Sequence, residues 1–275
     1  MKPPFDPELP RRYALVVSDI DGTLLDTQHS LRPESVQAVH EARGQGLRLT
    51  FASGRNRIEV VRFLEILGLR EPYIALGGAF VGDPGQALPI AHEALGPQEV
   101  ELILQLARRE ALSILFEDPD HVWFQGSSQE YQALRRMTES EIDWLEPGES
   151  LADRELSKIV LIGMDGKLRR AEADLAAARE QIAFARSMPT FLDITKAGAT
   201  KGRALGLLAA HMGIPAERIA VIGDGPNDVS MFALAGLSIA MANASVFVRA
   251  AADLVAPSND KDGFAWAMHE VLRQK

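Results

Sequence analysis

The run Tyr13–Ile20 constrains the fold more than any other stretch, because it is rich in β-branched residues and shows no regular alternation of apolar and polar side chains. A strand of this kind is typical of a parallel sheet that helices cover on both faces. Further strands are predicted at 47–52 and 73–78, with helices between them at about 33–44 and 56–67. The alternation of strands and helices with short links therefore predicts a parallel sheet.

The last third of the chain repeats this alternation. Strands are predicted at 218–224, 238–242 and 253–256, and helices at about 200–212, 228–235, 246–251 and 263–272. Helix signals support these boundaries, since Gly213 and Pro215 end the first of these helices. The two ends of the chain are therefore expected to build one sheet.

The middle of the chain has a different pattern, in which strands come in close pairs. The predicted strands are 112–118 with 121–126, a single strand at 157–164, and 182–187 with 190–195; helices are expected at 97–110, 128–139 and 167–181. Paired strands separated by single helices favour an open α+β sheet. We therefore predict a discontinuous core, residues 1–83 and 194–275, that carries an inserted domain at 84–193.

The charge and the composition exclude several classes of protein. Lysine and arginine total 29 against 38 acidic residues, which gives a net charge of −9 and does not favour a nucleic-acid partner. The sequence has no cysteine, so it offers no disulfide and no zinc–thiolate site, and it fits a cytoplasmic location. The apolar run after the paired arginines is too short for a signal peptide, and no stretch is expected to span a membrane. The N-terminus is interpreted as a frayed, proline-rich leader.

Polar motifs follow the ends of several predicted strands. Asp19 and Asp21 end the first strand, the sequence SGR (53–55) follows the second, and GDGPND (223–228) ends a strand of the last third, while Lys201 begins a helix. Ligands of open parallel sheets bind at the carboxyl ends of the strands. Each motif alone is compatible with a turn or a solvated surface, but the four together indicate one site.

Clustered carboxylates require a compensating charge. Two carboxylates held about 4 Å apart repel by roughly 4 kcal/mol at an effective dielectric constant of about 20. Asp19, Asp21, Asp224 and Asp228 offer only hard oxygen ligands, which favour Mg²⁺ over zinc. The sequence therefore predicts a Mg²⁺ site, where Mg²⁺ would take one or two carboxylates and a phosphate oxygen.

These motifs resemble those of the haloacid-dehalogenase-like superfamily, and within it the Cof-type phosphatases, over nearly the whole chain. The similar segments are DIDGTLL, FASGR, GATKGRAL, VIGDGPNDVSMFALAG and the tail from IAMANA to NDKDG. One departure is LGGAF (76–80), where relatives usually carry asparagine in place of Gly77. The resemblance implies the fold class α/β, with a Rossmann-like parallel sheet core and an inserted α+β cap domain.

The resemblance also implies the chemistry and the role of each site residue. Asp19 would be the nucleophile that forms an aspartyl-phosphate, and Asp21 the general acid and base. Asp19 and Asp224 would bind Mg²⁺ directly, Asp21 through its backbone carbonyl, and Asp228 would orient water or Lys201. The residues expected to hold the phosphoryl oxygens are Ser53, Gly54, Lys201 and Asn227.

The implied function is a Mg²⁺-dependent phosphatase that hydrolyses small phosphate monoesters such as sugar phosphates. A phosphomutase with the same core, and a non-catalytic protein that binds Mg²⁺ or phosphate, remain as alternatives. A nucleotide-binding dehydrogenase is disfavoured, because no G-x-G-x-x-G follows the first strand. The sequence assigns no oligomeric state.

Overall fold

The structure is a computed structural model that describes residues 12–136, 140–146, 149, 151 and 153–274. Within this part of the chain, one compact unit comprises residues up to Gly54, Val60–Ala91 and the residues from Thr200 onward. A second unit comprises Arg55–Glu59 and His92–Ala199. A leader is expected at the N-terminus, where residues 1–11 lie outside the described residues. The domain boundaries after 83 and 193 remain predictions.

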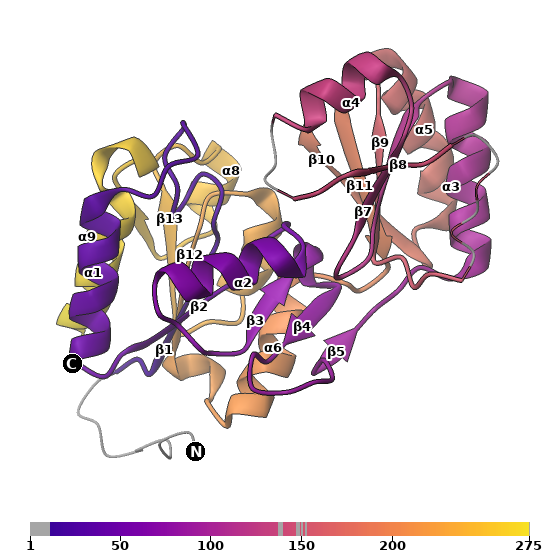
Figure 1. Cartoon of the computed structure of the whole chain (residues 1–275). Helices are drawn as coiled ribbons and strands as arrows, with labels where there is room; N and C mark the ends of the chain where they lie inside the picture. The colour runs from indigo at the N-terminus through magenta and orange to yellow at the C-terminus, as the bar shows by residue number, and fades with distance from the viewer. Residues whose placement is uncertain (1–11, 137–139, 147–148, 150, 152, 275) are drawn as a thin grey trace. The chain divides into compact units, whose positions relative to one another are not determined.

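The first unit contains the parallel sheet that the sequence predicts (Figure 1). Its strands pair in parallel in the order β14-β13-β12-β1-β2. Their bounds are β1 Leu15–Ser18, β2 Arg48–Phe51, β12 Ile219–Gly223, β13 Leu237–Met241 and β14 Leu254–Ala256. Strand β1 lies between β2 and β12 and is completely buried, as expected for a strand without polar alternation.

Helices cover both faces of this sheet, which completes a layered α/β unit. Their bounds are α1 Pro33–Gly44, α2 Arg57–Ile66, α6 Lys201–Met212, α7 Val229–Phe232, α8 Val246–Ala250 and α9 Gly263–Arg273. Helix α1 packs against α9 and α6 packs against α7. Figure 1 shows α1 and α9 side by side on one side of the sheet and α6 on the other. The predicted fold class is confirmed for this unit.

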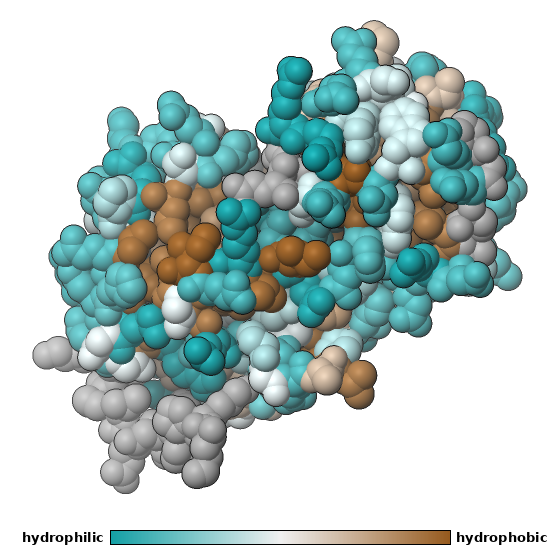
Figure 2. Space-filling model, viewed as in Figure 1, coloured by the Kyte–Doolittle hydropathy of each residue, from teal (hydrophilic) through white to brown (hydrophobic). Residues whose placement is uncertain are grey.

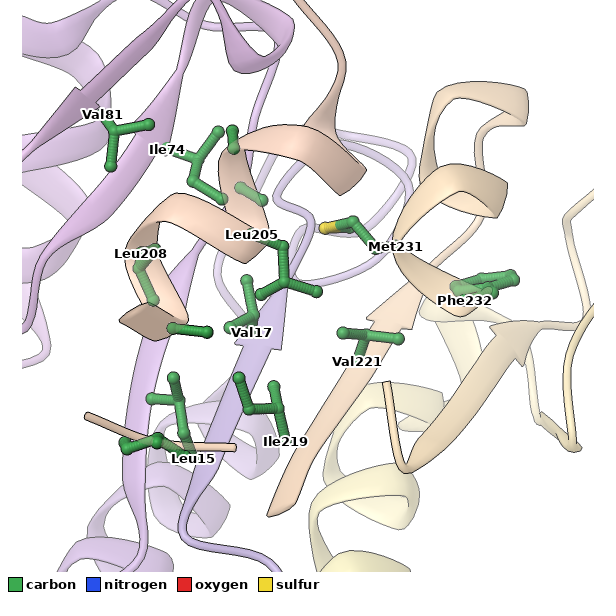
Figure 3. Packing of buried hydrophobic residues seen from close by; sticks show 14 of the residues in the cluster. Leu15, Val17, Ile74, Val81, Leu205, Leu208, Ile219, Val221, Met231 and Phe232 are labelled. Carbon is green, nitrogen blue, oxygen red and sulfur yellow. The ribbon is translucent and has the colours of Figure 1, made fainter. Parts of the chain in front are cut away.

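A hydrophobic core fixes α6 on the sheet. Figure 3 shows Leu205 and Leu208 of α6 directed toward Leu15 and Val17 of β1, and all four side chains are buried. Burying a leucine side chain contributes about 1.5–3 kcal/mol. The packing therefore holds the first residue of α6, Lys201, at a fixed place relative to β1.

The prediction of one continuous strand at 73–78 is wrong in its second half. Strand β3 (Tyr73–Ala75) ends where Leu76, Gly77 and Gly78 adopt positive φ angles and form a short 3₁₀ turn. The chain then reverses, and β4 (Phe80–Gly82) pairs antiparallel with β3. A third strand, β5 (Ala91–His92), completes a small sheet, which a single parallel bridge between Ala52 and Ile74 joins to the end of β2.

The second unit is an α+β unit with a largely antiparallel sheet of order β10-β11-β9-β6-β7-β8. The bounds are β6 Ser113–Glu117, β7 Val122–Gln125, β8 Asp143–Trp144, β9 Lys158–Ile162, β10 Ile182–Met188, β11 Phe191–Lys196, α3 Pro97–Glu110, α4 Ser128–Leu134 and α5 Asp165–Leu175. Both predicted strand pairs form antiparallel ladders. The predictions missed β8, which pairs parallel with β7. Helix α4 ends at Leu134 and α5 at Leu175, before the predicted ends at 139 and 181, and residues 137–139 lie outside the described residues.

The face of the molecule shown in Figure 2 is mainly hydrophilic, with hydrophobic residues gathered over the unit that holds the parallel sheet. Among the described residues, no helix combines the length and the apolar character that a membrane span requires.

Candidate active site

The register of the parallel sheet brings three of the predicted motifs to one edge. Ser18, the last residue of β1, pairs with Phe51 of β2 and with Ile222 of β12. Asp19 extends this ladder by donating its N–H to the Ile222 carbonyl at 2.9 Å. The residues that follow the three strands therefore lie together at the carboxyl end of the sheet.

Lys201 joins two of the acidic segments. Its Nζ donates to Asp19 Oδ1 and to Asp228 Oδ1, both at 2.7 Å, and the residue is 1% exposed. Thr200 caps the helix that Lys201 begins by accepting a hydrogen bond from the Arg203 N–H. Gly78 has a φ of +108°, and a Cβ there would lie 2.4 Å from the Thr200 carbonyl, so this approach of the two backbones requires glycine.

The carboxylate of Asp228 has no exposed surface and accepts hydrogen bonds on both oxygens. Oδ1 accepts from Lys201, whereas Oδ2 accepts from the N–H groups of Asp224 and Gly225 at 3.0 and 2.8 Å. Asp228 therefore closes the loop that follows β12 and holds the lysine ammonium.

Among the described residues, two side chains donate to the Asp224 carboxylate; both lie in the segments DIDGTLL and IAMANA, to which the sequence analysis gave no such role. Thr23 Oγ1 donates to Asp224 Oδ1 at 3.0 Å, and Asn243 Nδ2 donates to Asp224 Oδ2 at 3.2 Å. Gly22 has a φ of +74°, and a Cβ there would lie 2.3 Å from Asp224 Oδ2. The turn at Gly22–Thr23 and the carboxylate of Asp224 are therefore tightly packed.

The electrostatics of this cluster favour a further cation. Burial raises the pKa of Asp19 well above its ordinary value, with Asp228 and Asp224 adding to the rise and Lys201 opposing it. Burial and the charge of Asp228 raise the pKa of Asp224 to about 6. Burial lowers the pKa of Lys201, but the carboxylates of Asp19 and Asp228 reverse this effect and raise it overall. One ammonium thus faces three carboxylates, which leaves an excess of negative charge.

The donor set of this cluster fits a hard divalent cation. Asp19, Asp224 and Asp228 each offer a carboxylate oxygen, and these atoms lie within 4.8 Å of one another. Carboxylate oxygens without thiol or imidazole ligands are typical of Mg²⁺ or Ca²⁺ sites. The Asp21 side chain is not part of this group; its carboxylate is 43% exposed and lies 3.5 Å from His29 Nδ1. Coordination by the Asp21 backbone carbonyl stays a prediction.

The remaining predicted residues lie at the same sheet edge or beside it. Ser53 follows β2 and is buried, donating its N–H to the Ile74 carbonyl at 3.0 Å and accepting from the Gly77 N–H at 2.9 Å. Gly54 is half-buried and Asn227 is exposed. Gly77 has a φ of +67°, a conformation that asparagine also tolerates, so the departure noted in the sequence keeps the backbone geometry.

The comparisons with known proteins identify the family of this chain. The family model of haloacid dehalogenase-like hydrolases matches residues 16–268. The 5-amino-6-(5-phospho-D-ribitylamino)uracil phosphatase YwtE of Bacillus subtilis is 29% identical over 94% of this chain and 97% of its own. A haloacid dehalogenase-like hydrolase from Bacteroides thetaiotaomicron superposes with a TM-score of 0.83 at 28% identity, covering 94% of this chain and 99% of that one. The sugar phosphatase BT4131 shares the fold, with a TM-score of 0.82 at 24% identity over 93% of this chain and 98% of that one. The chain therefore belongs to the haloacid dehalogenase-like hydrolase family.

Proposed function

We propose that this protein is a Mg²⁺-dependent phosphatase that hydrolyses small phosphate monoesters through an aspartyl-phosphate on Asp19. The broader class, a phosphoric monoester hydrolase of this family, is confirmed by the family match and by relatives that are named phosphatases. The observation that carries the proposal is the buried Lys201, which is bonded to Asp19 and Asp228 beside Asp224.

In the first step, an oxygen of Asp19 forms a bond to phosphorus while the bond from phosphorus to the ester oxygen breaks. Asp21 donates the proton that the leaving alkoxide takes up. In the second step, the oxygen of a water molecule forms a bond to the same phosphorus and gives a proton to Asp21, while the bond between phosphorus and the Asp19 oxygen breaks. Inorganic phosphate is released and the Asp19 carboxylate is regenerated. The 43% exposure of the Asp21 carboxylate suits proton exchange with water.

Lys201 acts mainly by its charge in this proposal. Its ammonium donates a hydrogen bond to Asp19 Oδ1, so we assign the attack on phosphorus to Oδ2. The ammonium also offers a positive charge to the phosphoryl oxygens. Asp228 keeps the ammonium in place through its own hydrogen bond of 2.7 Å. Ser53, Gly54 and Asn227 are proposed to complete the phosphoryl site.

Asp19 and Asp224, with the backbone carbonyl of Asp21, would hold Mg²⁺. Bound there, Mg²⁺ would offset the repulsion between the carboxylates and an incoming phosphate. The three hydrogen bonds that Asp228 already accepts support an orienting role for it rather than direct coordination.

The proposed substrates are small phosphorylated metabolites, with sugar phosphates first. Two relatives in Bacillus subtilis are named for a phosphorylated ribityl compound, and a structural relative is named a sugar phosphatase. The second unit is proposed to select the leaving group as a cap. A cytoplasmic location belongs to the same proposal.

The test is turnover of p-nitrophenyl phosphate by the wild-type protein, by Asp19→Asn and by the control Asp165→Asn, an exposed aspartate of α5. Wild type and control should release inorganic phosphate with added Mg²⁺ and lose activity with EDTA, whereas Asp19→Asn should lose at least about 10³-fold in kcat. Retained activity in a folded Asp19→Asn protein would remove Asp19 from its role.

The same assay separates the alternatives. Phosphate release from sugar phosphates without any bisphosphate activator supports hydrolysis over a phosphomutase. A complete lack of release over a broad panel of phosphorylated metabolites would instead favour a non-catalytic protein that binds Mg²⁺ or phosphate.

A further inference from the structure

We propose that Asn243 is a positioning residue, whose side-chain amide orients the Asp224 carboxylate for the metal and fixes the turn at Gly22. This inference rests on the proposed function, because Asp224 is a proposed Mg²⁺ ligand. Asn243 lies between β13 and α8, far in sequence from both partners. It donates from Nδ2 to the Gly22 carbonyl at 2.8 Å and to Asp224 Oδ2 at 3.2 Å.

The orientation of this amide follows from chemistry. The backbone N–H of Asn259 points at the other end of the Asn243 amide, 3.1 Å from Oδ1. A backbone N–H can only donate, so the atom that faces it has to be the carbonyl oxygen. The NH₂ group therefore faces Gly22 and Asp224, and both of these partners are acceptors.

Asn259 in turn connects Asn243 to the segment that follows β1. It is 4% exposed and donates from Nδ2 to the Leu25 carbonyl at 2.9 Å. Its Oδ1 is buried without a hydrogen-bond partner among the residues that the structure describes. A buried acceptor without a partner is unfavourable. The hydrogen bond from Nδ2 to the Leu25 carbonyl is therefore the interaction that fixes the orientation of the Asn259 amide. Asn243 thus links three distant segments, because it bonds Gly22 and Asp224 through Nδ2 and Asn259 through Oδ1.

Asp224 depends on two donors, one for each oxygen. Thr23 holds Oδ1 and is fully buried, whereas Asn243 holds Oδ2 and is exposed. Without Asn243, the carboxylate keeps, among the described residues, one side-chain donor, Thr23, and gains freedom to rotate. A loss of such a contact behind a metal ligand typically weakens metal binding by about 10- to 100-fold. The exposure of Asn243 favours the lower end of this range.

The test measures Mg²⁺ binding by calorimetry on metal-free protein, together with kcat at saturating Mg²⁺. We expect Asn243→Ala to raise the dissociation constant for Mg²⁺ about tenfold and to change kcat at saturating Mg²⁺ by less than about threefold. The matched control is Ser245→Ala, which removes the cap of α8 in the same loop; in the described structure, Ser245 Oγ accepts from the Val248 N–H and makes no hydrogen bond to Asp224. Its Mg²⁺ affinity should stay within about twofold of wild type.

A double-mutant cycle with Thr23→Val tests the mechanism. Because Thr23 and Asn243 act on the same carboxylate, the effects of Thr23→Val and Asn243→Ala on Mg²⁺ affinity should not add. If Asn243→Ala is not folded by circular dichroism, Asn243→Ser, which is too short to keep the contact with Asp224, takes its place in the same measurements.

The outcomes distinguish this inference from the proposed function. A wild-type protein without Mg²⁺-dependent phosphate release overturns the proposed function. A wild-type protein that is active, with an Asn243→Ala or Asn243→Ser variant that binds Mg²⁺ as tightly as it does, overturns only the role of Asn243. Equal weakening in Ser245→Ala would also overturn it, since the loop rather than the amide would then be responsible.

Discussion

Replacing Asp224 by asparagine should stabilise the metal-free protein, although it removes a proposed metal ligand. Burial and the neighbouring Asp228 raise the pKa of Asp224 from 3.8 to about 6 in the folded state. The folded state therefore binds the proton more tightly than the unfolded state does. By linkage, the stability of the fold falls as the pH rises from about 4 to 6 and changes little above that range.

The size of the effect follows from the two pKa values. The difference between 3.8 and about 6 corresponds to about 3 kcal/mol of lost stability once Asp224 is fully ionised. At pH 4.5 the carboxyl is already largely ionised in the unfolded chain, so about 1 kcal/mol of this loss is present there. About 2 kcal/mol should therefore develop between pH 4.5 and pH 8 in the wild type and be missing in Asp224→Asn.

The assay is chemical unfolding of both proteins in EDTA at pH 4.5 and pH 8, followed by circular dichroism. Other carboxylates, such as Glu99 and Glu110, have pKa values lowered by partners on neighbouring elements and contribute in the opposite direction. Their contribution is the same in both proteins and cancels in the difference. Asp19, whose pKa Asp224 helps to raise, adds to the difference in the same direction. Adding Mg²⁺ at pH 8 should stabilise the wild type and leave Asp224→Asn nearly unchanged.

Two results would refute this reasoning. If the unfolding free energies of the wild type and Asp224→Asn differ by the same amount at pH 4.5 and pH 8, then burial and the charge of Asp228 do not raise the pKa of Asp224. Equal stabilisation of both proteins by Mg²⁺ would mean that the cation binds without this carboxylate.

Two further substitutions probe the packing around the same site. Gly22→Ala should abolish measurable turnover and destabilise the fold more than Gly46→Ala does. Both positions have positive φ, but only at Gly22 would a Cβ lie 2.3 Å from Asp224 Oδ2. The free energy of unfolding and kcat are measured for both variants, and equal effects would contradict the clash. Lys201→Met should cost about 3–5 kcal/mol of stability at neutral pH, because buried carboxylates lose their cation. Adding Asp228→Asn should restore part of that stability without restoring activity, and a lack of any recovery in unfolding experiments would argue against the pairing.

The strands and motifs that depend on local pattern could be predicted from the sequence. The run that contains β1 has no polar alternation because both of its faces are buried, and its burial in the structure is complete. The strand ends that carry Asp19 and Asp224 follow from the same pattern, since parallel strands deliver their carboxyl ends to one edge. The end of strand β3 at Ala75 could not be predicted, because Leu76 and Ala79 are apolar and fit a strand. In the structure, the chain instead turns at Leu76–Gly78, where the φ angles are positive.

The contact between Asn243 and Asp224 could not be predicted from the sequence for a different reason. The carboxylates are recognisable because their charge requires a partner. Asn243 is neutral, exposed and 19 residues from Asp224; it lies in the family-like segment IAMANA, but that pattern does not show which residue its side chain contacts. Its position becomes meaningful only when the parallel order of β12 and β13 places the residues after both strands at the same edge. The proposed ligands therefore follow from the clustered charges in the sequence, whereas the residue proposed to orient them follows from the register of the sheet.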